Sequence, residues 1–418
     1  MFCEVGMKKI INILVLIYII VSVFLLFSKK DNNEILTVDE SEDINMLSMM
    51  LETEAGSGKY KETTASSWPT DGYNFNSSLS KCEKGSSLRW NDDTKKVIME
   101  GNSADKCYIF FDKIPDSLIL SNFIKSLYTG VQGKNNIYYH NGTIKDDDGT
   151  VLDANDNSYR FAGSSSSVNN FVCFGYDNVD DNCNTDNLYR IIGVFNDRIK
   201  LIKFDFANSD LLGTDGAYVG KWTASLYDYY EGSKSFINTY KWNGNTNSNN
   251  WNTSYLNTIN LNVNYLNSIG NEWSKMIDVT NWQVGGNTYT NILSKVNLVY
   301  NYEILNPSTN SLYKSKIGLI YVSDYGYAAV PSSWNTSVYR YEERTSWIYF
   351  GENFLTITRK SNDNGDFYLV TRAGAISYYS VSNGYGVRPA FYLNSSVKIL
   401  NNVGDGSKNN PYKIFLPN

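Results

Sequence analysis

The chain has 418 residues, of which 42% are hydrophobic and 19% are charged, and its formal net charge is −6. This length suffices for two or three domains, and the lack of a concentrated Lys or Arg footprint argues against a nucleic-acid partner. The charged share lies below the usual level of about 25%, and Asn, Ser, Gly and Tyr fill the gap. This composition predicts a mainly β protein with minor α content (α+β) and long polar loops.

The N-terminus carries an apolar run beside positive charges. Lys8 and Lys9 precede residues 10–27, and a second lysine pair follows them. A helix over this run extends about 27 Å, close to the hydrocarbon thickness of about 30 Å in a bilayer. Residues 1–30 are therefore interpreted as an uncleaved signal anchor whose partner is the lipid bilayer, since no small-residue cleavage site follows. A cleaved signal peptide and a buried core helix are the alternatives.

Four cysteines follow this run: Cys82, Cys107, Cys173 and Cys183. Pairing Cys82 with Cys107 and Cys173 with Cys183 closes two local loops, but three connectivities and four free thiols all stay open. No Cys-x-x-Cys occurs, which argues against a zinc ribbon or a redox motif. Paired structural cysteines indicate an oxidising compartment. We therefore expect a single-pass protein of the cell membrane with its C-terminal domains extracellular.

The first part of the chain is predicted to contain a stalk and a small domain. Residues 31–60 form the stalk or linker, with an acidic stretch and a short amphipathic helix at 46–51. Residues 61–113 form a small β module. Within it, a polar turn predicts a hairpin at 88–99, and an apolar stretch predicts a strand at 107–111.

The second part is predicted to be larger. Residues 114–170 are interpreted as a connector with one helix, at 115–128, and polar loops. The larger domain spans 171–418 and opens with a hairpin at 188–202, where Asn-Asp separates two apolar strands. One helix is expected at 254–269. Further strands are expected at 317–322, 354–357, 367–371, 375–379, 387–393 and 412–416.

Several short segments of the larger domain recur in a fixed order, namely YRIIG at 189–193, WNTS at 251–254, GLI at 318–320, Trp347, GVRPAFYL at 386–393, GDGS at 404–407 and NPYKI at 410–414. In this order they resemble an uncharacterised family of surface and secreted proteins of gut Firmicutes. Trp347 and the block at 386–389 are also similar to the C-type-lectin-like fold of formylglycine-generating-enzyme relatives, which implies that fold for 171–418. Those enzymes use a Cys pair as copper ligands, and no Cys follows Cys183, so their activity is not implied.

Aromatic residues gather in an Asn-, Gly- and Ser-rich region at 215–255. Exposed Trp and Tyr stack on sugars or anchor a protein partner, so this region predicts a binding patch. Packing in the core is the alternative. Candidate binding residues also include Arg388, for which loop anchoring through backbone carbonyls is the alternative. The full set is Trp222, Tyr227, Tyr229, Tyr230, Trp242, Trp251, Trp347 and Arg388.

The chain has a single histidine, His140, which excludes histidine-dependent triads and multi-histidine metal sites. It lies in a predicted turn, where a structural or solvent-exposed role is expected. Acidic loops at 146–149 and 153–157 are candidates for weak calcium binding. Ser158 occupies the glycine position of an EF-hand loop, which favours ordinary Asx turns instead. No metal or cofactor is predicted.

These patterns together predict a membrane-anchored extracellular surface protein that binds a glycan or a protein without catalysis. A structural or pilin-like assembly component is the first alternative, although the Glu usual after a pilin leader's apolar start is missing. An extracellular hydrolase is the second alternative. Glu342, Glu343 and Asp324 lie near aromatic residues, but the separation of two catalytic carboxylates cannot be obtained from sequence.

Overall fold

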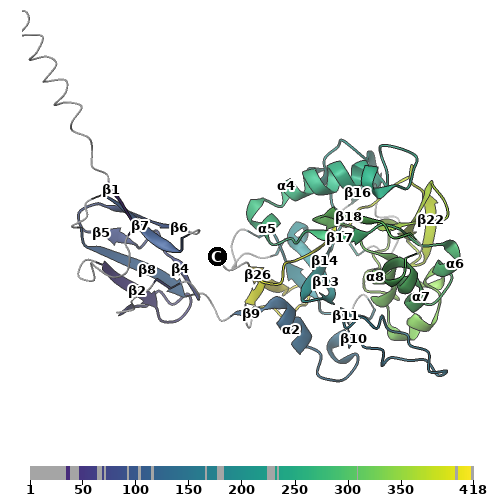
Figure 1. Cartoon of the computed structure of the whole chain (residues 1–418), viewed down its shortest axis with the longest axis horizontal. Coiled ribbons are helices and arrows are strands. Elements are labelled where there is room, and N and C mark those ends of the chain that lie inside the picture. Colours follow the sequence, from purple (N-terminus) through teal and green to yellow (C-terminus); the bar gives the residue numbers. More distant parts are fainter. Residues whose placement is uncertain are drawn as a thin grey trace, which may run out of the picture. The chain divides into compact units, whose positions relative to one another are not determined.

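The computed structural model divides the chain into two units, Met1–Asp116 and Ser117–Pro417, each with its own hydrophobic core (Figure 1). In the part of the chain that the structure describes, no helix is long and apolar enough to cross a membrane. The anchor predicted at 10–27 lies outside that part. The described residues are 34–37, 47–63, 68–69, 72–91, 94–101, 105–113, 117–164, 167–176, 183–223, 231–232, 235–307, 309–400 and 403–415.

The first unit consists of two sheets that share one core. One sheet has the strand order β1-β7-β6, and the other has the order β3-β2-β8-β4 with β5 also paired to β8. β2 and β8 run parallel, and the other pairs are antiparallel. The strands are β1 (Glu34–Thr37), β2 (Leu47–Glu52), β3 (Tyr60–Thr63), β4 (Tyr73–Phe75), β5 (Lys81–Cys82), β6 (Ser87–Asn91), β7 (Lys96–Gly101) and β8 (Cys107–Lys113).

Phe111 of β8 lies in the middle of this core. The ring centroids of Trp90 and Phe75 are 5.7 and 5.9 Å from its own, so both sheets contribute aromatic side chains to one interior. The predicted disulfide between Cys82 and Cys107 is confirmed and ties β5 to β8. The predicted hairpin is confirmed as well, because β6 and β7 pair antiparallel.

The helix predicted at 46–51 is wrong, and the stalk that contained it is wrong over the same segment. β2 occupies this segment, pairing parallel with β8 and antiparallel with β3. Met49 of β2 lies in the core. A short apolar segment fits a helix and a strand about equally well, so its length and spacing do not decide between them. Here the hydrogen bonds to a strand far along the chain decide.

The second unit is built on a large sheet with the order β19-β24-β14-β13-β12-β26-β25-β9, while β11 pairs with β13 and with β10. The predicted β13–β14 hairpin is confirmed. Its turn residues Asn196 and Asp197 have φ of 48° and 63°, the positive values that a tight two-residue hairpin turn requires. The strands are β9 (Ser117–Ile119), β10 (Ile137–Tyr139), β11 (Tyr159–Phe161), β12 (Phe171–Cys173), β13 (Leu188–Phe195), β14 (Arg198–Lys203), β19 (Ile317–Gly318), β24 (Ala390–Tyr392), β25 (Lys398–Leu400) and β26 (Tyr412–Phe415).

Smaller sheets and short helices surround this sheet. The smaller sheets are β15-β16-β23, β17-β18 and β20-β21-β22. Their strands are β15 (Tyr218–Thr223), β16 (Phe236–Lys241), β17 (Thr280–Gln283), β18 (Leu312–Ser315), β20 (Phe354–Arg359), β21 (Asp366–Val370), β22 (Ile376–Ser380) and β23 (Gly384–Tyr385). The α-helices are α2 (Leu120–Ser126), α3 (Ser209–Leu212), α4 (Leu266–Ser268), α5 (Asn271–Lys275), α6 (Tyr289–Ile292), α7 (Val296–Tyr300) and α8 (Val322–Tyr327). Wider π-type turns occupy Leu256–Tyr265 and Asn301–Leu305, and tighter 3-10 turns occupy Lys134–Asn136, Thr185–Asn187, Trp251–Thr253, Pro331–Asn335 and Val338–Arg340.

The connector predicted at 114–170 is wrong as a separate segment. Its described residues belong to the second unit, because β9 pairs with β25, β11 pairs with β13, and α2 packs against β13 and β14. The helix predicted at 115–128 is confirmed only over α2, with a strand before it. The strand predicted at 317–322 is shorter than expected, because the Asp324 carboxylate accepts the backbone N–H of Tyr321 and so caps the start of α8 at that point. The β-rich class is confirmed, with 36% strand and 20% helix.

Candidate functional site

Two tryptophans predicted for a surface patch, Trp242 and Trp251, lie in the core of the second unit. They are 0% and 1% exposed, and their ring centroids are 4.9 Å apart. The indole N–H of Trp242 donates a hydrogen bond of 2.9 Å to the carbonyl of Thr356. The prediction of an exposed patch is therefore wrong at both positions. The polar residues around both tryptophans suggested an exposed segment, but Asn249, one of them, is itself buried and donates to three backbone carbonyls.

Trp347 and Arg388 are also buried, each with an exposed fraction of 1%. Arg388 donates from Nε to the carbonyl of Lys203 at 3.0 Å and from Nη1 to the carbonyl of Ile348 at 2.7 Å. Its guanidinium lies 4.4 Å from the ring centroid of Phe350. These contacts confirm the loop-anchoring interpretation of Arg388. Neither side chain presents surface to a ligand, so both are removed from the candidate binding residues.

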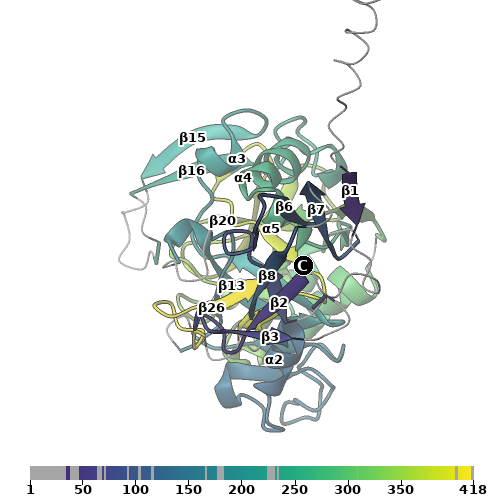
Figure 2. The same ribbon diagram turned by 90° about the vertical axis from the view of Figure 1, so that its left-hand side faces the viewer.

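Trp222 is the patch member that the described structure places on the surface. It is 56% exposed and lies on β15, in a hairpin with β16 at the periphery of the second unit (Figure 2). Phe236 of β16 and Val219 of β15 are 56% and 52% exposed. The two strands of this hairpin therefore offer apolar side chains to solvent. Tyr230, like the two other tyrosines predicted for the patch, lies outside the described residues.

Three tyrosines from separate elements form another exposed aromatic surface, which we call the tyrosine cluster. Tyr289 begins α6, Tyr339 lies in a 3-10 turn, and Tyr378 lies on β22. The ring of Tyr289 packs edge-on against the other two, at centroid distances of 6.0 and 5.4 Å. Tyr339 and Tyr378 are each 40% exposed. The Lys360 ammonium lies 4.0 Å from the Tyr378 centroid and is paired with Asp363 and Asp366, at 3.7 and 3.3 Å.

The chemistry of the tyrosine cluster suits binding rather than proton transfer. Desolvation and the phenols of Tyr339 and Tyr378 raise the pKa of Tyr289, so its hydroxyl stays protonated at neutral pH. A tyrosine ring stacks on an apolar face while its hydroxyl exchanges hydrogen bonds, and edge-to-face packing holds the rings in place. The sequence does not indicate this surface, because the three residues lie far apart in the chain and no local pattern joins them.

A buried ion pair joins Arg160 to Asp156 inside the second unit. The distance from Nη2 to Oδ2 is 2.6 Å, and the guanidinium lies 4.9 and 4.8 Å from the ring centroids of Tyr300 and Tyr327. The Tyr300 hydroxyl donates to Asp156 at 2.7 Å. Burial alone would raise the pKa of Asp156, but the Arg160 charge and hydrogen bonds outweigh it and hold the pKa well below its ordinary value. These contacts hold the carboxylate in a structural role.

A second buried charged group lies at the N-terminus of α8. Lys200 Nζ is 2.5 Å from Asp324 Oδ2, and the two side chains are 0% and 4% exposed. Asp324 accepts the backbone N–H of Tyr321 at 2.9 Å, and Glu303 accepts that of Ser323 at 2.9 Å. Asp324 was a candidate carboxylate for glycoside hydrolysis. Its burial and its contacts leave it without access to a polymeric substrate.

His140 is fully buried, which confirms the structural interpretation and excludes the solvent-exposed one. Its Nδ1 accepts the backbone N–H of Ala154 at 3.0 Å, and its ring packs against Tyr327 and Trp334 at 4.9 and 5.2 Å. Among the described residues, Nε2 has no hydrogen-bond partner. Burial, together with the nearby charge of Arg160, lowers the pKa of His140 well below its ordinary value.

In the two acidic loops proposed as calcium sites, the carboxylates accept hydrogen bonds from other groups of the protein. Asp153 accepts the backbone N–H groups of Gly142 and Ile144, at 3.0 and 3.1 Å. Asp146 accepts from Lys295 Nζ at 2.9 Å. No group of three His, Cys, Asp or Glu side chains suited to a metal ion occurs within the described ranges. Asp146 and Asp153 also accept the backbone N–H groups two residues on, of Asp148 at 3.1 Å and of Asn155 at 2.9 Å, which confirms the Asx-turn interpretation.

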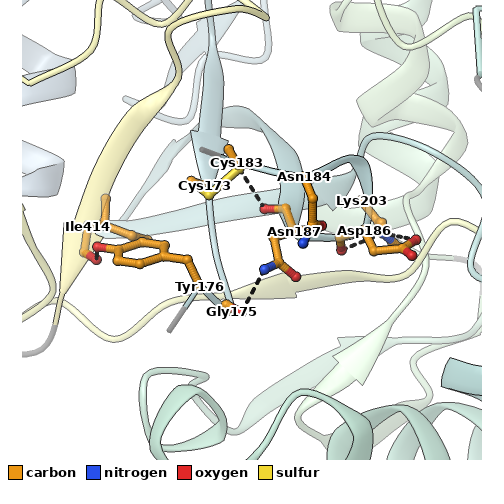
Figure 3. The surroundings of a disulfide bond; sticks show 9 residues. All are labelled: Cys173, Gly175, Tyr176, Cys183, Asn184, Asp186, Asn187, Lys203 and Ile414. Carbon is orange, nitrogen blue, oxygen red and sulfur yellow. Dashed lines mark hydrogen bonds and ion pairs between the residues drawn. A yellow bond between two sulfur atoms is a disulfide. The ribbon is translucent and has the colours of Figure 1, made fainter. Parts of the chain in front are cut away.

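The second predicted disulfide, Cys173–Cys183, is also confirmed (Figure 3). Its Cα atoms are 5.7 Å apart, and the Cys183 sulfur lies 3.4 Å from the carbonyl of Asn187. The Asn187 amide in turn donates to the carbonyl of Gly175 at 2.7 Å. The bond therefore belongs to a hydrogen-bonded loop that begins directly after β12.

No family model, no curated protein and no solved structure matches this chain. The resemblance to a Firmicutes surface family and to the C-type-lectin-like fold therefore stays a prediction. The candidate site rests on geometry, and the tyrosine cluster is its best-defined exposed aromatic surface.

Proposed function

We propose that the chain is a membrane-anchored extracellular surface protein whose second unit binds a glycan or a protein ligand without catalysis. The apolar run at 10–27 supports the anchor, and the two disulfides support an oxidising compartment. The proposal includes the C-type-lectin-like fold for 171–418 and the relation to Firmicutes surface proteins. The observation that carries ligand binding is the tyrosine cluster.

Aromatic side chains support this proposal through their contact area and their rigidity. A tyrosine loses little conformational freedom on binding, and its ring and hydroxyl serve apolar and polar contacts at once. Binding energy in interfaces concentrates in a few aromatic and Arg residues, each contributing about 2 kcal/mol or more. Two tyrosines at 40% exposure, held in place by Tyr289, fit that role.

The proposal is tested by applying the full chain, in detergent, to arrays of glycans and of extracellular matrix proteins. Tyr378→Ala is compared with Tyr302→Ala, because Tyr302 is 39% exposed and lies outside the tyrosine cluster. We expect one class of ligand to bind the wild type and the Tyr302 variant, and to bind the Tyr378 variant at least tenfold more weakly. No binding on either array, or equal binding by all three proteins, would contradict the proposal.

The exposed apolar residues of the β15–β16 hairpin favour a second candidate, a structural component of a surface assembly. Trp222, Phe236 and Val219 are each more than half exposed, which suits a contact with another protein copy. This candidate predicts that the protein occurs in high-mass surface polymers and that Trp222→Ser disperses them. A protein found only as a monomer at the surface would exclude the second candidate and leave the first.

A further inference from the structure

Lys200 and Asp324 are placed for a covalent reaction as well as for an ion pair. Lys200 lies on β14 and Asp324 lies in α8, 124 residues along the chain. The distance from Nζ to Oδ2 is 2.5 Å, so the carboxyl carbon lies one bond beyond this contact. Both side chains are buried, which keeps bulk water from competing for either group.

The surroundings of this pair are aromatic. Four ring centroids lie within 6 Å of Lys200 Nζ, at 4.5, 5.1, 5.3 and 5.9 Å, and they belong to Tyr321, Tyr392, Trp282 and Phe195. Burying two ions costs several kcal/mol each, which the attraction between them offsets only in part. Desolvation alone would lower the pKa of Lys200, but Asp324 outweighs the desolvation and raises that pKa, so the resting pair is ionic. The neutral amine and the neutral acid, which are the reactive forms in amide formation, therefore arise only by proton transfer within the site.

Glu303 is a second buried carboxyl group, and its charge interacts with that of Asp324. Asp324 accepts the backbone N–H of Tyr321, and Glu303 accepts the two that follow, at Val322 and Ser323. The two carboxyl groups therefore sit on consecutive amides of one helix start. Desolvation raises the pKa of Glu303 despite the opposing hydrogen bonds, which suits a group that takes up and returns a proton. The charge of Arg160 also interacts with Asp324 and favours a developing oxyanion.

We propose that Lys200 and Asp324 condense into an intramolecular amide, with Glu303 as the proton carrier. One ammonium proton passes through Glu303 to the Asp324 carboxylate, leaving a neutral amine and a neutral acid. Nζ attacks Cγ, so a C–N bond forms and one C–O bond breaks. The departing oxygen carries that proton and a second one from the nitrogen. Water leaves, one amide N–H remains, and no oxidant or reductant is required.

The test is peptide mass mapping of the full chain after thiol reduction. Trypsin does not cleave after an acylated lysine, so we expect a branched peptide that joins Lys200 to Asp324 and lacks the mass of one water. The contact of Lys295 with Asp146 is the internal control. Its N–O distance is 2.9 Å, but Lys295 is 36% exposed, and both peptides should stay linear. Linear peptides for Lys200 and Asp324 from folded wild-type chain would overturn the proposal and leave an ordinary ion pair.

Variants of Lys200, Glu303 and Asp324 test the role of each residue in the reaction. Lys200→Arg keeps the charge and should give only linear peptides. Glu303→Gln keeps both reacting groups and should lose the branched peptide, and an undiminished yield would remove Glu303 from the reaction. Asp324→Asn should form the same amide by releasing ammonia, so its branched peptide should have the same mass as that of the wild type. Because the wild-type map alone decides whether the bond exists, a variant that fails to fold leaves the test intact.

Discussion

Replacing Trp242 by alanine separates a core role from a ligand-binding role. Removing a fully buried aromatic side chain costs about 3–5 kcal/mol, because the site collapses only partly around the cavity. Loss of the indole hydrogen bond to the Thr356 carbonyl adds about 1 kcal/mol. We therefore expect Trp242→Ala to lower the free energy of unfolding of the second unit by about 5 kcal/mol. That loss is comparable to the whole stability of a marginal domain, about 5–15 kcal/mol.

Urea unfolding followed by far-UV circular dichroism measures this loss. For a slope of about 3 kcal/mol per M, the midpoint should fall by roughly 1.5 M or more. Trp222→Ala is the matched control, since Trp222 is 56% exposed and its removal should change stability by less than about 0.5 kcal/mol. A Trp242→Ala variant that keeps its unfolding midpoint but loses ligand binding would refute the core assignment.

Three further predictions use the same unfolding assay. The pKa of His140 in the folded state lies well below its unfolded value of about 6.5. Its contribution to the free energy of unfolding is therefore complete above about pH 6.5 and is lost as the pH falls below that value, by about 1.4 kcal/mol per pH unit. Comparing pH 7 with pH 5.5 should show this slope in the wild type and not in His140→Gln. Replacing Cys82 and Cys107 by serine should lower the free energy of unfolding of the first unit by about 3 kcal/mol. An unchanged unfolding midpoint of the first unit would contradict this. Arg388→Met should lower the free energy of unfolding of the second unit by about 3 kcal/mol, because two buried carbonyls lose the hydrogen bonds that Arg388 donates. A loss of ligand binding without destabilisation would instead support a ligand-binding role for Arg388.

Local patterns predicted the local parts of the fold. The β13–β14 hairpin was predictable because two apolar strands flank Asn196 and Asp197, which adopt the positive φ that such turns need. Each disulfide joins two consecutive cysteines of the chain, which are 25 and 10 residues apart. The segment of β2 was misassigned because its partner β8 is remote, and hydrogen bonds between remote strands leave no periodic signal in a six-residue stretch.

The candidate site depended on contacts that the sequence does not encode locally. Trp242 and Trp251 lie among Asn and Ser residues, yet those polar side chains satisfy buried backbone groups instead of lining a surface. The tyrosine cluster joins three segments through side-chain packing, and in a chain with 33 tyrosines nothing marks these three beforehand. The contact of Lys200 with Asp324 was hidden for the same reason.

The affinity of tyrosine-cluster variants for the array ligand tests the central claim most directly. The double variant Tyr339→Ala/Tyr378→Ala removes both exposed rings, and Tyr378→Phe keeps the ring but removes its hydroxyl. We predict that the double variant binds at least roughly 30-fold more weakly, corresponding to about 2 kcal/mol, while its unfolding midpoint stays unchanged. Tyr378→Phe should lose less than the double variant, since stacking persists. Wild-type affinity in the double variant would contradict the account.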